Sequence, residues 1–421
     1  MRTKAVRLYG KNDLRLEEFE LPPIKQDEML ARIVSDSICM SSYKAAVQGS
    51  DHKRVPLDID RNPVIIGHEF CGIIMEVGEK WEKEFKKGDK FSIQPALNQS
   101  HDPYAAPGYS FPYIGGHATY VVLPNVVMES GCLLPYKGNA FFYGSLAEPM
   151  SCIIGAFNAQ YHTVQGSYDH SMGLTKNSKM AILAGVGPMG LGAIDYAIHG
   201  ERKPGLLVVT DIDEARLKRA ASVYTVEEAE KNGVRLLYVN TSLPGQGYDY
   251  LMELTDGTGY NDVMVFAPVK PLVEMGDRLL SHDGCLNFFA GPNNPEFTAE
   301  FNFYNVHYNA THVVGTSGGN TRDMVMALDG MARGIINPAP MITHIGGLNC
   351  AAETTLNLPK IPGGKKLIYT GIDMPLTALA DLERLGESDP LYKRLSEIID
   401  EYDGLWNAEA ENYLLSHAKP I

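Results

Sequence analysis

Apolar and polar positions alternate in short runs over the first 127 residues of the chain, and glycine or proline separates the runs. A period of two is typical of strands that bury one face, so several such runs predict an antiparallel, barrel-like sheet. Segment 51–62 is polar, and segment 98–115 is rich in proline, glycine and tyrosine, so both predict loops. The expected strands are Lys4–Leu8, Met29–Ser35, Gly72–Val77, Lys90–Gln94 and Ala118–Leu123.

A different pattern begins near residue 147, where helical spacing first appears, and it continues to residue 315. Continuous apolar runs there alternate with helical stretches such as Lys270–Ser281. Apolar strands separated by helices predict a parallel sheet covered on both faces, and six of them complete a doubly wound sheet. The six runs are Met180–Ala184, Leu206–Val209, Arg235–Val239, Asp262–Ala267, Cys285–Ala290 and His312–Gly315.

The rest of the chain returns to a mixed pattern. Arg322–Gly334 has helical spacing, and the apolar run Lys365–Ile368 predicts a closing strand. Beyond Pro375, the stretches LTALADLERL and YKRLSEIIDEYDGLW also have helical spacing, so we expect a helical extension there. The fold class is therefore α/β, with the parallel sheet inserted into a chain that is otherwise barrel-like.

The turn after the first strand of the parallel sheet has the spacing G-x-G-x-x-G and opens a helix expected over 188–198. The first glycine permits a tight turn, the second lets backbone N–H groups approach a pyrophosphate, and the third allows close packing of helix on strand. The positive end of the helix then faces the phosphates. The predicted cofactor-binding residues of this turn are Gly185, Gly187, Pro188, Met189 and Gly190.

Asp211 ends the second strand, 21 residues after Gly190. A carboxylate at this position accepts hydrogen bonds from both hydroxyls of the adenine ribose and repels a 2′-phosphate, which favours NAD over NADP. Arg216 either clamps the same ribose or is a solvated helix arginine. Because Thr210 or Arg216 can soften the preference set by Asp211, NADP stays open as the alternative.

Charge and cysteine content narrow the function classes. The 421 residues include 37 basic and 51 acidic side chains, and the net charge of −14 excludes nucleic acid and anionic membranes as partners of the whole molecule. The amino terminus lacks a signal-peptide core and no apolar run approaches a membrane span, so we expect a cytoplasmic protein. Six scattered cysteines without a C-x-x-C indicate neither a disulfide framework nor a four-cysteine zinc site.

Cys39, His68, Glu69 and Glu148 lie upstream of the nucleotide turn. A thiolate, an imidazole and carboxylates together suit a four-coordinate zinc ion with one replaceable position. The wide spacing leaves another interpretation open, in which the histidine is structural, the thiol is buried and the carboxylates lie on the surface.

The segment Gly67–Gly78, GHEFCGIIMEVG, resembles the GHE-x-x-G-x-V-x-x-V-G signature of the zinc-containing medium-chain dehydrogenases. The stretches SICMS, GGHATYV and LAEPMS, which begin at Ser37, Gly115 and Leu146, resemble their metal-cysteine turn, their G-G-x-A-x-Y strand and the E-P-L-S stretch of the polyol branch. The pair Thr210-Asp211, followed by ARL from Ala215, is similar to the same region of sorbitol dehydrogenases. Within this branch the Cys-Met-Ser-Ser turn at Cys39 and the long chain resemble bacterial enzymes of the L-sorbose 1-phosphate reductase type.

This resemblance implies roles for individual residues. Cys39, His68 and either Glu69 or Glu148 would hold zinc, and the second glutamate would hold the metal-bound water or exchange with it. Ser41 matches the hydroxyl that relays the substrate proton. Lys44 stands where many relatives have a relay histidine, so it either shuttles protons, binds a phosphate or is merely solvated.

Two departures from the family pattern affect the metal sites. Ser42 replaces an acid that usually supports the zinc histidine, and loss of such a partner lowers metal affinity by about 10- to 100-fold. Segment 98–115 contains no cysteine, so we expect one catalytic zinc and no structural zinc. On the polar loop, Lys53 and Arg54 either meet a sugar phosphate or are solvated.

The resemblance implies a GroES-like β-barrel catalytic domain (1–153 and 316–421, including the helical extension) and a Rossmann domain (154–315), with the active site in the cleft between them. The expected function is zinc-dependent, NAD-linked oxidoreduction of a secondary alcohol and its ketone in a polyol or sugar phosphate, by a homo-oligomer such as a dimer or tetramer. Two rival hypotheses are a metal-free NADPH-dependent reductase of the quinone or enoyl type, and a nucleotide-binding protein that has lost catalysis.

Overall fold

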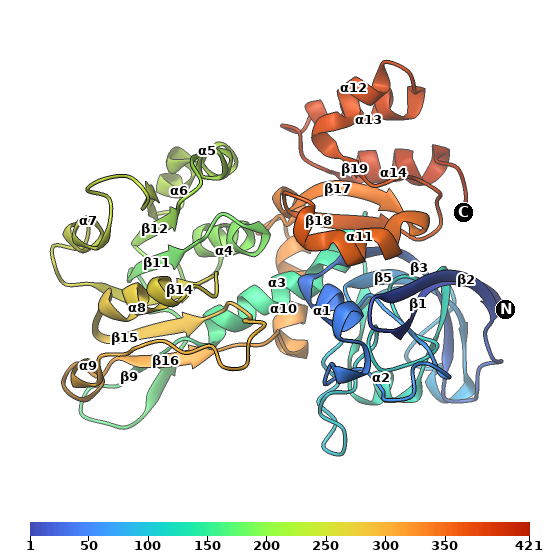
Figure 1. Ribbon diagram of the computed structural model, residues 1–421, viewed down its shortest axis with the longest axis horizontal. Helices are drawn as coiled ribbons and strands as arrows, with labels where there is room; N and C mark the ends of the chain where they lie inside the picture. The colour runs from blue at the N-terminus through green and yellow to red at the C-terminus, as the bar shows by residue number, and fades with distance from the viewer. The chain divides into compact units, whose positions relative to one another are not determined.

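The computed structural model describes residues 1–421, and the chain forms two compact units (Figure 1). The barrel unit comprises Met1–Glu148, Asn320–Ala332 and Pro338–Ile421, and the parallel-sheet unit comprises Pro149–Gly319 and Arg333–Asn337. The domain boundaries expected from the sequence, near residues 153 and 315, stay a prediction. None of the helices combines the length and the apolar character that crossing a membrane requires.

The barrel unit is built on two sheets whose strands are mostly antiparallel. Its strands are β1 (Arg2–Gly10), β2 (Asp13–Glu20), β3 (Met29–Ile38), β4 (Val64–Ile65), β5 (Phe70–Val77), β6 (Lys90–Ile93), β7 (Tyr120–Leu123), β8 (Leu133–Tyr136), β17 (Ile342–Gly347), β18 (Lys365–Tyr369) and β19 (Thr377–Ala378). The small sheet has the order β2-β1-β4, and the large one has the order β19-β17-β18-β3-β5-β6-β8 with β7 beside β3.

All five strands predicted in the first 127 residues are present, and the predicted closing strand is β18. The strand pairs within the first 127 residues are antiparallel, as predicted, whereas β17 and β18, which come later in the chain, are parallel. Strand β17 has no clean alternation in the sequence, so its place in the sheet depends on pairing with distant strands rather than on its own pattern.

The helices of the barrel unit include the expected carboxy-terminal extension. They are α1 (Met40–Gln48), α2 (Asn125–Glu129), the first part of α3 (Phe141–Ala159), α10 (Thr321–Ala332), α11 (Ala351–Asn357), α12 (Leu382–Gly386), α13 (Pro390–Asp400) and α14 (Ala408–His417). The helix predicted over LTALADLERL is wrong in its first half. Thr377 pairs with Ile345 at the edge of the large sheet, and this tertiary pairing overrides the helical spacing until Leu382.

The carboxy-terminal extension packs on the start of α3. Trp406 is fully buried there, in one cluster with Phe142 and Leu146 of α3. The first N–H groups of a helix have no partner within the helix, and those of Phe141 and Phe142 donate to the carboxylate of Glu411 in α14. The extension therefore supplies the carboxyl group that caps the amino-terminal end of α3.

The parallel-sheet unit contains the six strands that the sequence predicts, and the doubly wound sheet is confirmed. The strands are β11 (Lys179–Leu183), β12 (Leu206–Asp211), β13 (Arg235–Asn240), β14 (Tyr260–Val265), β15 (Leu280–Phe288) and β16 (His312–Gly315). Their order, β13-β12-β11-β14-β15-β16, is that of the dinucleotide-binding fold, and all neighbours are parallel. The order reverses between β11 and β14, where such folds bind their ligands.

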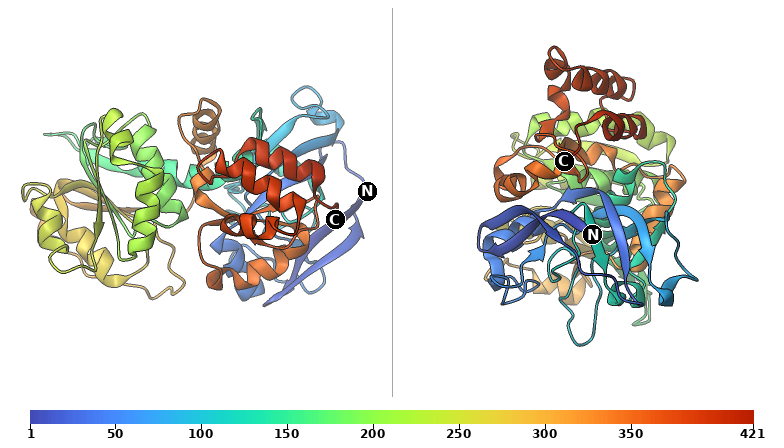
Figure 2. Two further views of the ribbon diagram at one scale, coloured as in Figure 1. Left: turned by 90° about the horizontal axis from the view of Figure 1, so that it is seen from above. Right: turned by 90° about the vertical axis from the view of Figure 1, so that its right-hand side faces the viewer.

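Helices cover both faces of this sheet (Figure 2). They are α4 (Pro188–His199), α5 (Glu214–Val223), α6 (Val226–Lys231), α7 (Tyr248–Glu253), α8 (Lys270–Arg278) and α9 (Phe303–Tyr308), together with the remainder of α3. A hairpin of β9 (Tyr161–Thr163) and β10 (His170–Met172) was not predicted, because strands of three residues are too short to show a period.

Candidate active site

Cys39 lies at the junction between β3 and α1 in the barrel unit. Its backbone is extended and it is the residue before the first turn of α1, so the thiol is held where the helix dipole favours negative charge. Burial and the nearby Glu69 carboxylate nevertheless raise the pKa of the Cys39 thiol, and Lys365 acts in the opposite direction. A metal cation at this thiol would favour the thiolate, which is the form that ligates metals.

His68 and Glu69 occupy the turn that precedes β5, and the sterics of this turn explain the glycine before them. Gly67 has φ of +93°, and a Cβ there would lie 2.1 Å from Oδ2 of Asp36. The other carboxylate oxygen of Asp36 accepts the backbone N–H of Glu69 at 3.0 Å. Asp36 in β3 therefore fixes the turn that presents both side chains.

The sulfur of Cys39, a ring nitrogen of His68 and a carboxylate oxygen of Glu69 all lie within 4.8 Å of one another. Sulfur, imidazole nitrogen and carboxylate oxygen are ligands that zinc accepts, so this donor set fits a zinc ion. The structure thus brings together three of the four residues that the sequence proposes as metal ligands.

Ser42 contacts the far side of the histidine ring. Its hydroxyl lies 3.1 Å from Nδ1 of His68, and both side chains are buried. A hydrogen bond at Nδ1 favours the tautomer whose Nε2 lone pair is free for a metal. The serine that replaces the usual acid therefore still occupies the supporting position, although it supplies no charge.

Glu69 has a cationic partner that the sequence analysis missed. Nζ of Lys365, at the start of β18, lies 2.5 and 2.6 Å from the two carboxylate oxygens, and the Ser37 hydroxyl donates to the same group. Burial disfavours both charges, but the attraction between them outweighs this effect. The pKa of the Glu69 carboxyl is therefore lowered and the pKa of the Lys365 ammonium is raised. The Glu69 carboxylate is ionised and held in place.

Glu148 is not among the three clustered ligands, but it lies close enough to interact with them. It is buried near the middle of α3. Burial, together with the charges of Glu69 and Cys39, raises the pKa of Glu148 to about 7, against a lowering by His68. This carboxyl can therefore exchange a proton near neutral pH, which suits a group that holds or replaces a water on the metal.

Ser41 joins the cluster to an aromatic hydroxyl that the sequence analysis did not single out. The Ser41 hydroxyl donates to the sulfur of Cys39 at 3.1 Å and accepts from the Tyr109 hydroxyl at 2.8 Å. Tyr109 also lies 3.2 Å from Nε2 of His68, and burial raises its pKa well above the usual value, so it stays protonated. Lys44 lies one helical turn further along α1, and burial lowers the pKa of its ammonium.

Two sequence signals point to the missed residues. Tyr109 belongs to the tyrosine-rich loop 98–115, which the sequence analysis considered only as a lost structural metal site. Gly108 shows why the loop is close: a Cβ there would lie 2.0 Å from the carbonyl oxygen of Gly67. Lys365 and Lys366 are two cations at the start of a buried strand, which is unusual unless each has a partner.

The nucleotide turn lies between β11 and α4 in the parallel-sheet unit. A Cβ at Gly190 would lie 2.1 Å from the carbonyl oxygen of Gly185, so the third glycine permits close packing of helix on strand. No atom lies within 4 Å of the position a Cβ would take at Gly187, which leaves this glycine open to a ligand. Pro188 and Met189 then form the first turn of α4.

Asp211 ends β12, and its carboxylate accepts the backbone N–H groups of Ile212 at 2.8 Å and Asp213 at 3.0 Å. These bonds orient the side chain at the carboxyl edge of the sheet. Arg216 in α5 lies 3.5 Å from the carboxylate of Asp213 rather than beside Asp211. The ribose contact proposed for Arg216 stays a prediction.

Comparison with known proteins agrees with this architecture. The alcohol dehydrogenase GroES-like domain matches residues 25–130. The chain is 53% identical to mannitol-1-phosphate 5-dehydrogenase of Aliivibrio fischeri over 98% of this chain and 97% of that protein. It is 51% identical to L-sorbose 1-phosphate reductase of Klebsiella pneumoniae over 100% of this chain and 98% of that protein. The crystal structure of 2R,3R-butanediol dehydrogenase from Bacillus subtilis shares the fold, with a TM-score of 0.69, 20% identity, and coverage of 87% of this chain and 99% of that one.

The chain combines a barrel unit, a parallel-sheet unit and the cluster formed by the Cys39 sulfur, a His68 nitrogen and a Glu69 oxygen. This combination defines the class of dehydrogenases with a GroES-like catalytic domain. The chain belongs to the zinc-containing medium-chain dehydrogenase/reductase family. The predictions of family, fold class and oxidoreductase activity are confirmed.

Proposed function

We propose that this enzyme interconverts a secondary alcohol of a phosphorylated polyol with the corresponding ketone, using NAD and one catalytic zinc ion. The cluster of Cys39, His68 and Glu69, linked through Ser41 to Tyr109, carries the proposal. Mannitol-1-phosphate 5-dehydrogenase and L-sorbose 1-phosphate reductase, relatives of more than 50% identity whose names specify phosphorylated substrates, support the substrate class.

The zinc ligands of the proposal are Cys39, His68 and either Glu69 or Glu148. When bound, zinc supplies Lewis-acid polarisation of the reacting oxygen. The nicotinamide accepts or supplies the hydride. Because Lys365 holds Glu69 on one side, Glu148 is the more readily exchanged of the two carboxylates.

Residues of the chain itself handle the proton. In the oxidation direction the alcohol loses a proton and a hydride, and NAD takes the hydride. The Ser41 hydroxyl can take up the alcohol proton while it passes its own onward, since a hydroxyl is both donor and acceptor. Tyr109, whose hydroxyl donates to Ser41 at 2.8 Å, is the next hydroxyl in this path once that hydrogen bond reverses, and Lys44 or Glu148 is the proposed further acceptor.

NAD is the proposed cofactor because a carboxylate at the end of β12, such as that of Asp211, accepts hydrogen bonds from the adenine ribose and repels a 2′-phosphate. A single zinc is proposed because no cysteine occurs in segment 98–115. The cytoplasm is the proposed compartment, since all six cysteines are free thiols.

A homo-oligomer is part of the proposal. Strand β16 is the last strand at one end of the parallel sheet, and Val313 in it is exposed. Beside it in sequence, α9 exposes Phe303 and Tyr308, with 76% and 63% of their surfaces accessible. Unpaired strand edges and clustered apolar side chains are features of surfaces that pair with a second chain.

Metal analysis combined with turnover tests the function. Protein purified without added metal should contain about one zinc per chain, oxidise mannitol 1-phosphate with NAD, and reduce L-sorbose 1-phosphate with NADH. A chelator should abolish both reactions, and zinc should restore them. Turnover that persists without metal would favour the metal-free reductase, and absence of turnover with zinc present would favour the inactive nucleotide-binding protein.

A further inference from the structure

We propose that three consecutive residues, His52, Lys53 and Arg54, form the subsite that binds the phosphate group of the substrate. This inference rests on the proposed function, because it locates the phosphate relative to the Cys39 and His68 cluster. The three residues stand in the loop that follows α1, at the end of the barrel unit where Cys39 lies.

Tyr109 connects this loop to the reacting centre. Its hydroxyl lies beside Ser41 and His68, and the guanidinium of Arg54 lies over its ring, 5.4 Å from the centroid. The His52 ring is stacked on the same tyrosine at 5.8 Å. The ring of Tyr109 therefore lies between the proposed metal site and the side chains of His52 and Arg54, which can bind an anion. A polyol chain is long enough to bridge this separation.

Lys53 and Arg54 have no acidic partner, whereas two other cations at this loop, Lys11 and Arg61, do. Asp51 pairs with Lys11 at 2.5 Å, and Asp60 lies 3.8 Å from Arg61. No ion pair involves Lys53 or Arg54, whose contacts are with the rings of Tyr104 and Tyr109. Positive charge is thus left uncompensated at this place in a chain of net charge −14.

His52 adds a neutral donor. Burial, then the charges of Arg54, Lys53 and Lys44, lowers its pKa to about 4, so the ring is uncharged at neutral pH. Because Nδ1 accepts the backbone N–H of Arg54 at 3.3 Å, the proton lies on Nε2. A phosphate would meet two cations and one N–H, which is a common combination for this group.

The backbone of the loop is also held in place. The Ser110 hydroxyl donates to the carbonyl oxygen of Arg54 at 2.7 Å, and it accepts the N–H of Ala106 at 3.0 Å. Segment 98–115 thus fixes both Tyr109 and the position of Arg54. A subsite held in this way needs little ordering when it binds.

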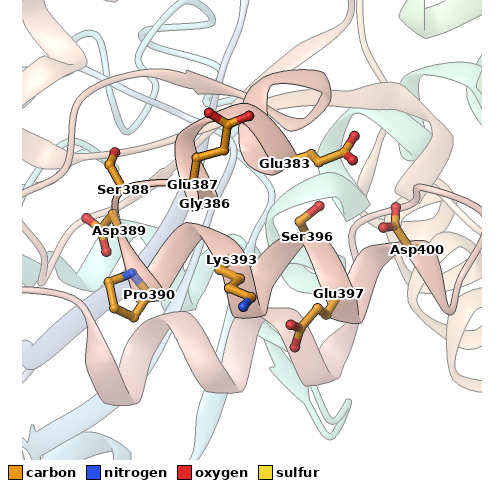
Figure 3. A pocket seen from close by; sticks show the side chains of 10 residues that line it. All are labelled: Glu383, Gly386, Glu387, Ser388, Asp389, Pro390, Lys393, Ser396, Glu397 and Asp400. Atoms are coloured by element: carbon orange, nitrogen blue, oxygen red, sulfur yellow. The ribbon is translucent and has the colours of Figure 1, made fainter.

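A pocket of about 740 Å³ between α12 and α13 has the opposite character (Figure 3). Its lining includes five acidic side chains and a single cation, Lys393. Such a lining repels a phosphate, so this pocket of the carboxy-terminal extension is not a second candidate for the phosphate subsite.

The test compares Arg54→Met and Lys53→Met with Arg61→Met, which removes an exposed cation of the same loop that already has an acidic neighbour. The readout is the ratio of kcat/KM for mannitol 1-phosphate to that for mannitol. Loss of one charge-assisted contact should lower this ratio by roughly 10- to 100-fold in Arg54→Met. Arg61→Met should leave it unchanged.

Inorganic phosphate provides a second measurement. It should inhibit mannitol oxidation competitively in the unmodified enzyme, and the inhibition constant should rise in Arg54→Met by a similar factor. Equal ratios in all three variants, with no effect on phosphate inhibition, would overturn the subsite while the proposed function stands. An unmodified enzyme that oxidises neither polyol would instead overturn the proposed function.

Discussion

Lys365 and Glu69 form a buried ion pair across 296 positions of sequence, with Nζ 2.5 Å from one carboxylate oxygen and 2.6 Å from the other. Removing one partner of such a pair leaves the other as an uncompensated buried charge. We therefore expect Lys365→Met to destabilise the barrel unit by about 3–5 kcal/mol. Combining it with Glu69→Gln should restore most of the loss.

Thermal unfolding of the chelator-treated protein measures this effect without a contribution from bound metal. Lys86→Met, which removes an exposed lysine of the same unit, is the control. A double variant no more stable than Lys365→Met would show that the pair is not the cause.

The Ser42 hydroxyl at Nδ1 of His68 should set how well the site holds zinc. Ser42→Ala leaves Nδ1 without this partner, and loss of such a contact costs about 10- to 100-fold in metal affinity. Competition against a zinc-binding dye measures the change. An affinity within twofold of the unmodified protein would mean that the histidine ring is oriented by other contacts.

Asp211 should control the choice between NAD and NADP. Asp211→Ser removes an acceptor for the ribose and the repulsion of a 2′-phosphate, so kcat/KM for NAD should fall by roughly 10-fold or more while that for NADP rises. Glu214→Gln removes a negative charge from the start of α5 and serves as the control. Equal changes in both variants would indicate a general charge effect rather than a ribose contact.

Glu411 should give the protein a pH-dependent stability. Burial raises its pKa to about 7, against the lowering by hydrogen bonds from Tyr369 and the start of α3. The folded state therefore binds this proton more tightly than the unfolded state does. The contribution is fully present below about pH 4.5 and is lost as the pH rises through about 7.

Glu411→Gln removes that titration. Between pH 5 and pH 8 the unmodified protein should lose stability relative to this variant, by a free energy of unfolding on the order of 3 kcal/mol. Melting temperatures of both proteins measured across this pH range report the change. Glu409→Gln, on the same helix but with an exposed side chain, is the control. A pH-independent difference would show that Glu411 does not titrate in this range.

The exposed edge of the parallel sheet should hold two chains together. Phe303→Asp places a charge in the apolar surface of α9, so the oligomer should dissociate at micromolar concentration. Val325→Asp, at another exposed apolar position on α10 of the barrel unit, should not change the mass. Light scattering measures both, and an unmodified protein that is already monomeric would contradict the prediction.

The parts of the molecule that could be predicted from sequence depend on short-range physics. Close contacts within the turn require the glycines at 185 and 190, and the carboxylate of Asp36 that faces Gly67 requires a glycine there. Apolar runs separated by helices predict a parallel sheet because each strand is buried on both faces. These features can be recognised within a few dozen residues.

The other parts depend on pairings between distant segments. Nothing near Glu69 in sequence indicates that Lys365 neutralises it, and nothing near Ser41 indicates that Tyr109 contacts it. Thr377 has helical neighbours in sequence, yet it pairs with β17 because the sheet edge offers partners. Sequence patterns therefore predicted which residues cluster, Cys39, His68 and Glu69, better than they predicted the groups that hold these side chains in place.

Glu411 in α14 accepts the backbone N–H groups of the first turn of α3, the helix that carries Glu148. Translation runs from the amino terminus, so α3 emerges from the ribosome long before the carboxylate that caps it. The nascent chain can form its nucleotide fold early, but the helix that carries Glu148, a proposed metal ligand, acquires this cap only after α14 has been synthesised. Chains that stop before α14 would then lack this support for the proposed site.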